Sequence, residues 1–93
     1  MRALLIHSLK LIDEAGGIEE RKIWRIAKSE KNPDGVRYRL AYIPRGQKRP
    51  AVLYDNHHPK GHHKHIGERQ VAYAFDGVGK LLKDFESDIE ALR

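Results

Sequence analysis

The chain has 93 residues and no cysteine, and its 18 Lys and Arg residues outnumber its 13 Asp and Glu residues, which gives a formal net charge of +5. This length fits one domain with a thin core, and the lack of cysteine excludes disulfide bonds and thiolate metal sites. No apolar run approaches the roughly 18 residues that span a membrane, and no secretory signal is recognisable, so we expect a cytoplasmic protein.

Two strands are predicted in the first part of the chain. Residues 2–13 mix apolar and polar side chains, and residues 19–27 follow after the turn signal Ala15-Gly16-Gly17. The pair is typical of a β-hairpin. His7, which is isolated in an apolar strand, is expected to be structural.

The clearest strand pattern covers residues 36–43, after the turn signal Asn32-Pro33-Asp34-Gly35. Its apolar residues alternate with Arg37 and Arg39, and this period of two predicts a half-buried antiparallel strand. We expect both arginines on its uncovered face. The alternation favours core positions for Tyr38 and for Trp24 of the preceding strand.

Two further strands are predicted, at residues 51–55 and 62–75, with a loop at residues 57–61 between them and a bulge near Gly67. Asp55 and Asn56 end the first of these strands. Because both residue types commonly bond their own backbone two residues on, we favour a turn-forming role over a catalytic one.

The last predicted element is a helix over residues 76–93, with Asp76 as its N-cap. One apolar stripe with helical spacing consists of Val78, Leu81, Leu82, Phe85, Ile89 and Leu92. We therefore predict an α+β fold in a single domain: residues 1–75 form an antiparallel β-meander of about five strands, and residues 76–93 form a C-terminal α-helix that covers one face.

The positive charge is concentrated in the middle of the chain. From Lys31 to Arg69 there are nine basic and three acidic residues, whereas from Asp76 to Arg93 there are three basic and five acidic residues. A basic sheet beside an acidic helix is typical of a surface that faces a polyanion, although a merely solubilising surface would have the same composition.

Five of the six histidines lie within nine residues, at His57, His58, His62, His63 and His65. On a strand, His63 and His65 project to one face, and His62 and Lys64 to the other. Since the usual pKa of histidine is near 6.5, one ring can accept a proton while another donates one. His63 and His65 are therefore the candidate base and acid for metal-independent cleavage of RNA.

Other residues have candidate roles around this histidine pair. Glu68 can orient a histidine or act as the base, or it can form a salt bridge with Arg69 or Lys64. A cation is also needed where negative charge develops on the phosphate. The candidate phosphate- and RNA-binding residues are Arg37, Arg39, Lys60, Lys64, His57, His58, His62 and Tyr54, the last as a stacking surface for a base.

Two alternatives remain open for the histidine segment. The His-x-His pair can chelate zinc or nickel, with Asp55, His57, His58 or Glu68 as a third ligand, although nothing fixes the remaining ligands. The same surface can also bind phosphate, or an acidic partner, without catalysis. We favour a protein without metal or cofactor.

The chain resembles the TumE family of small prokaryotic toxins. The resemblance rests on Ile23-Trp24-Arg25, Tyr38-Arg39-Leu40, Tyr54-Asp55-Asn56-His57-His58, His62-His63-Lys64-His65-Ile66-Gly67, and the closing segment from Phe75 to Glu90. It implies a toxin that is encoded beside a TumA-like helix-turn-helix antitoxin, and it suggests ribonuclease activity. RNA and the antitoxin are the expected partners, and a homodimer through a sheet edge or the helix is compatible with the thin core.

Overall fold

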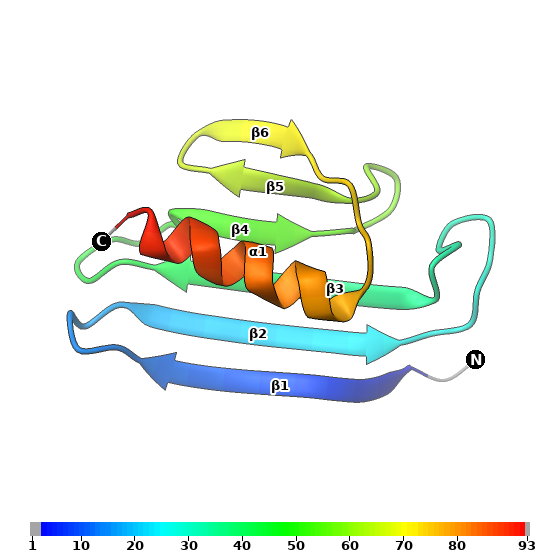
Figure 1. Cartoon of the computed structure of the whole chain (residues 1–93), viewed down its shortest axis with the longest axis horizontal. Coiled ribbons are helices and arrows are strands. Elements are labelled where there is room, and N and C mark those ends of the chain that lie inside the picture. Colours follow the sequence, from blue (N-terminus) through cyan, green and yellow to red (C-terminus); the bar gives the residue numbers. More distant parts are fainter. Residues whose placement is uncertain (1–2, 93) are drawn as a thin grey trace.

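The computed structural model describes residues 3–92, in which six strands precede one helix (Figure 1). The strands form one antiparallel sheet whose spatial order equals the chain order. The elements are β1 (Leu4–Ile12), β2 (Ile18–Arg25), β3 (Val36–Ile43), β4 (Val52–Asp55), β5 (His63–Ile66), β6 (Arg69–Ala72) and α1 (Val78–Glu90). The predicted α+β meander with one covering helix is confirmed.

Two details differ from the prediction, and two predicted ends fall outside the described residues. The segment expected as one bulged strand is the hairpin of β5 and β6, because Gly67, with a φ of 60°, allows a tight turn there. The helix begins at Val78, after Gly77 as N-cap, and no side chain caps it, so Asp76 does not have the expected role. Arg2 and Arg93, where the first strand and the helix were expected to begin and end, lie outside the described residues.

The core lies between α1 and one face of the sheet. Alternate residues of β3 and β4 point toward the helix, which contributes one apolar stripe. The largest fully buried side chains are Ile23, Tyr38, Leu40, Val52, Tyr54, Leu81 and Phe85. Figure 1 shows α1 lying over the middle strands β3 and β4 at a small angle to them, so only one face of the sheet is covered.

Hydrogen bonds at the rim of the core tie α1 to the sheet. The hydroxyl of Tyr54 donates to Asp88, and that of Tyr73 donates to Asp84 at 2.6 Å. Lys64 Nζ also lies 3.0 Å from Asp88. These contacts pair the polar ends of aromatic side chains with carboxylates of the helix and so favour the observed position of the helix along the sheet.

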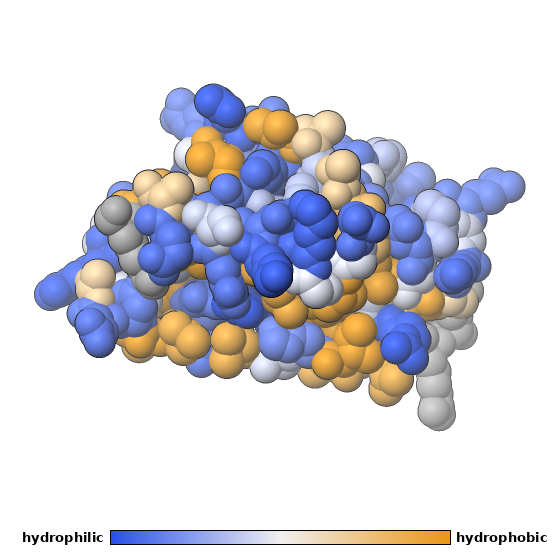
Figure 2. Space-filling view, in the orientation of Figure 1, coloured by the Kyte–Doolittle hydropathy of each residue, from blue (hydrophilic) through white to orange (hydrophobic). Residues whose placement is uncertain are grey.

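Strand β1 lies at the edge of the sheet, away from the helix. Its residues Leu4, Leu5, Ile6, Leu11 and Ile12 are between 37% and 72% exposed. In Figure 2, apolar residues gather along the lower edge of the molecule, where Figure 1 shows β1. Across the described residues, no helix is both long and apolar enough to cross a bilayer.

Buried tyrosines should make the fold sensitive to alkaline pH. Burial, and then the hydrogen bond to Asp88, raise the pKa of Tyr54 far above its usual value, and burial also raises the pKa of Tyr38 and Tyr73. Below about pH 10 both folded and unfolded chains keep these protons; above it the unfolded chain loses them first. The free energy of unfolding should therefore fall as pH rises from about 10, by up to about 1.4 kcal/mol per pH unit for each tyrosine.

Urea unfolding at pH 8 to 11, compared between the wild type and Tyr54→Phe, measures this effect. The variant should show the shallower decline, because one titrating group is gone while the lysines are common to both proteins. Identical declines would contradict the assignment of Tyr54 as a buried, protonated hydroxyl.

Candidate functional site

The sheet face opposite α1 has no helix over it, and we call it the open face. The strand register places in one row across it Lys22 of β2, Arg39 of β3, Asp55 of β4 and His63 of β5. In neighbouring rows Trp24 stands opposite Arg37, and Leu53 opposite His65. Both arginines are exposed, as alternation in β3 predicted. The open face thus combines cationic, aromatic and imidazole groups that are not part of the core between the sheet and α1.

His63 and His65 lie side by side on this face. Their ring centroids are 5.1 Å apart, with ring planes at 80°. His63 is only 7% exposed, and its Nδ1 lies 2.8 Å from the carbonyl oxygen of Gly61. Because a carbonyl only accepts, Nδ1 donates the proton of this hydrogen bond, and in the neutral ring Nε2 holds the free lone pair. The local geometry therefore favours Nε2 of His63 as a proton acceptor.

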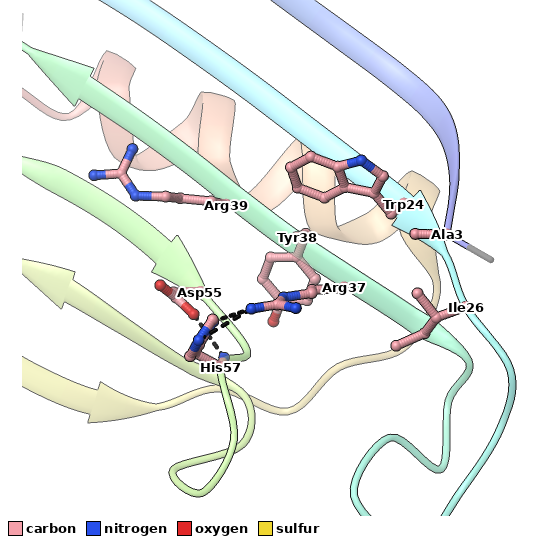
Figure 3. Close-up of a pocket in the computed structure, with 8 residues that line it drawn as sticks. All are labelled: Ala3, Trp24, Ile26, Arg37, Tyr38, Arg39, Asp55 and His57. Carbon is pink, nitrogen blue, oxygen red and sulfur yellow. Dashed lines mark hydrogen bonds between the residues drawn. The ribbon is translucent and has the colours of Figure 1, made fainter. Parts of the chain in front are cut away.

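The loop after β4 forms one wall of a cavity beside these rings. The cavity has a volume of about 360 Å³ and is lined by Leu53, Asp55, His57, His58, Pro59, Lys60, His63 and His65. Oδ1 of Asp55 accepts a hydrogen bond of 2.6 Å from the backbone N–H of His57, which is the turn-forming role expected for this residue. Nη2 of Arg37 lies 2.9 Å from Nδ1 of the His57 ring (Figure 3), so this imidazole is positioned by an arginine of β3.

Asn56 attaches the start of this loop to β3. It is 7% exposed; its side-chain oxygen accepts from the backbone N–H of Tyr38 at 2.9 Å, and its amide donates to the carbonyl of Val36 at 2.8 Å. Beyond the end of β4, the Asn56 side chain thus makes the two hydrogen bonds to β3 that the backbone of a longer strand would make. Because both partners belong to β3, Asn56 determines where the histidine loop leaves the sheet.

Three of the predicted site residues lie on the helix side of the sheet. Tyr54 is fully buried, so it offers no surface for a base, and Lys64 pairs with Asp88 of α1. His62 is stacked on Phe75 with ring centroids 4.6 Å apart, and its nitrogens contact the Tyr38 hydroxyl at 2.8 Å and Asp34 at 2.7 Å. Strand alternation explains this placement, since it predicted that His62 and Lys64 face away from His63 and His65.

The remaining predicted residues lie at the margins of the open face. Glu68 is exposed in the turn between β5 and β6, and it lines a cavity of about 490 Å³ together with His65 and Arg49. Lys64 bonds elsewhere, so the salt bridge between it and Glu68 is not formed. Lys60 is exposed and donates to Gln70 at 3.3 Å, and His58 is exposed in the loop.

Sequence reasoning misplaced Trp24. It was expected in the core, but Ile23 fills that position at 0% exposure, and Trp24 is half-buried on the open face. Trp24 of β2 lies directly opposite Arg37 of β3, and residues opposite each other on paired strands share a face. Counting outward along both strands from the turn at Asn32–Gly35 could therefore have predicted that Trp24 lies on the same face as Arg37.

No cluster of three or more His, Cys, Asp or Glu side chains suited to a metal ion occurs among residues 3–92.

Replacement of Asn56 by Ala should destabilise the protein by about 2 kcal/mol, because a buried backbone N–H and a partly buried carbonyl of β3 lose their partner. Urea unfolding measures the loss, and hydrogen exchange should quicken at His57–Gly61. Gln47→Ala, which removes an exposed amide in another turn, is the control and should change stability by less than about 0.5 kcal/mol. Equal stability of the two variants would rule out this role of Asn56.

A sequence model of the family described as Toxin TumE matches residues 5–93. No curated protein and no solved structure matches the chain.

Proposed function

Since the chain belongs to the TumE family of toxins from toxin–antitoxin systems, we propose that it acts as an endoribonuclease that needs no metal and uses histidines of the open face. The observation that carries this proposal is the adjacent pair His63 and His65, in register with Arg39 through Asp55. A base, an acid and a cation on one face are the groups that cleavage of a phosphodiester requires.

In the proposed reaction Nε2 of His63 removes the proton of a ribose 2′-hydroxyl. The 2′-oxygen then attacks the neighbouring phosphorus, and a 2′,3′-cyclic phosphate forms as the bond to the 5′-oxygen breaks. His65, in its protonated form, donates a proton to that leaving oxygen. Arg39, which lies in the same row as His63, supplies positive charge where negative charge develops on the phosphate oxygens, and Arg37 attracts the neighbouring RNA backbone.

The margins of the open face have supporting roles in this proposal. Lys60, His57 and His58 border the cavity beside the histidine pair and contact the backbone of the RNA. Glu68 lines a cavity with His65 and orients that imidazole. His62, Lys64 and Tyr54 do not contact the RNA in this proposal. They stabilise the strands that position the site.

Membership of the family implies an antitoxin as partner. We propose that it is a helix-turn-helix protein with an acidic segment that covers the basic open face, because the same charges that attract RNA attract such a segment. RNA as substrate points to the cytoplasm as the place of action. A homodimer stays a prediction.

A second candidate is RNA binding without cleavage, and the low exposure of His63 favours it. In that case the open face contacts phosphates only, and affinity falls steeply with salt while the RNA stays intact. The cleavage assay separates the two candidates.

The wild type should cleave RNA in the presence of a chelator, and His63→Asn and His65→Ala should each lower the rate by about 10² to 10⁴ while RNA binding changes much less. Asn is used at position 63 because its amide can still donate to the Gly61 carbonyl. Gel analysis of labelled RNA gives the rates, and fluorescence anisotropy gives the affinities.

His7→Leu is the matched control. This histidine lies on β1, and its Nε2 is buried without a hydrogen-bond partner, so leucine should fit and activity should stay at the wild-type level. Full cleavage by both site variants would remove His63 and His65 from the mechanism, and RNA left intact by the wild type would leave binding as the function.

A further inference from the structure

A second cavity on the open face surrounds Trp24. It has a volume of about 400 Å³ and lies on the opposite side of the histidine loop from the histidine pair. Its lining consists of Ala3, Trp24, Ile26, Arg37, Tyr38, Arg39, Asp55 and His57 (Figure 3). Asp55 and His57 also line the cavity beside His63, so the two cavities are neighbours.

The lining of this cavity combines apolar and aromatic side chains with arginines. Trp24 and Ile26 supply apolar surface, whereas Arg37 and Arg39 bring guanidinium groups from the adjacent strand. The indole of Trp24 is half-buried on the open face, and it is not part of the core, which lies on the other face of the sheet. A flat aromatic surface beside two fixed cations fits a flat ring attached to a phosphate, which is the chemistry of a nucleotide.

We propose that this cavity is a base-binding subsite, in which a nucleobase of the RNA stacks on Trp24 and its adjacent phosphate contacts Arg37 or Arg39. The subsite rests on the proposed function, because it identifies single-stranded RNA as the substrate. A base in a duplex is stacked on its neighbours and cannot reach the indole, so unpaired segments are selected.

The spacing places the subsite away from the bond that is cleaved. Strands of a sheet lie about 4.8 Å apart, so Trp24 on β2 and His63 on β5 are separated by roughly 15 Å. The base on Trp24 therefore belongs to a different nucleotide from the one that loses its 2′-proton. Arg39 lies between the two groups in the sheet and can contact the connecting backbone.

Trp24 is the chain's single tryptophan, so its fluorescence reports on this cavity alone. The probes are two 2′-O-methyl oligonucleotides of five nucleotides, which cannot be cleaved: one carries all bases, and the other has the same backbone with abasic positions. The oligonucleotide with bases should quench the fluorescence. The abasic one should bind through its phosphates with little quenching.

Trp24→Leu and Trp24→Phe form a matched pair, since both keep an apolar side chain on the strand but only Phe keeps an aromatic ring. Leu should weaken binding of the base-containing oligonucleotide about 10-fold and leave the abasic one unchanged, whereas Phe should retain most of the affinity. With cleavable RNA, Leu should raise KM with little change in kcat. Ile12→Ala, at an exposed apolar residue of β1, should alter neither affinity.

Equal quenching by both oligonucleotides, or equal affinities in the Leu and Phe variants, would overturn the subsite. If the wild type still cleaves RNA in that case, the proposed ribonuclease function stands without it. If the base-dependent quenching is found but RNA stays intact, the subsite stands and the cleavage proposal fails.

Discussion

Packing of α1 against one face of the sheet is the interaction on which the other features depend. Leu81, Phe85 and Ile89 of the helix bury the aromatic and aliphatic residues of the middle strands. Because neighbouring residues of a strand point to opposite faces, this single contact assigns every residue of β3, β4 and β5 either to the core or to the open face. Arg37 and Arg39 can then line the open face at little cost to stability, since they remain exposed to water, and the mostly buried His63 is hydrogen-bonded to the carbonyl of Gly61.

The side chains of strand β5 make contacts on both faces of the sheet. Lys64 bonds to Asp88 of the helix, while His63 and His65, its neighbours on either side, point to the open face. His62 packs between core aromatics just before the strand. The histidine-rich segment is therefore partly structural, and its structural members position the pair that faces outward. Asn56 does the same for the loop on the other side of the cavity.

Alternation and turn signals were enough to predict most of the fold. The strand at residues 36–43 and the apolar stripe of the helix emerged directly from their periods. Alternation also paired His63 with His65. For β2 it favoured the wrong set of residues, because Ile23 and Trp24 are both apolar; the pairing of Trp24 with Arg37 places Trp24 on the open face. At Gly67 the sequence allowed either a bulge or a turn, and pairing between β5 and β6 selected the turn.

The strand order has a consequence for the growing polypeptide on the ribosome. Each strand pairs with the one made just before it, so the sheet can assemble hairpin by hairpin during synthesis. The helix that gives the sheet its core is translated after all six strands. In the complete fold, Tyr38, Leu40 and Tyr54 are buried in the cluster to which Leu81, Phe85 and Ile89 of this helix belong. The core beneath the histidine pair can therefore be completed only after translation has passed residue 90.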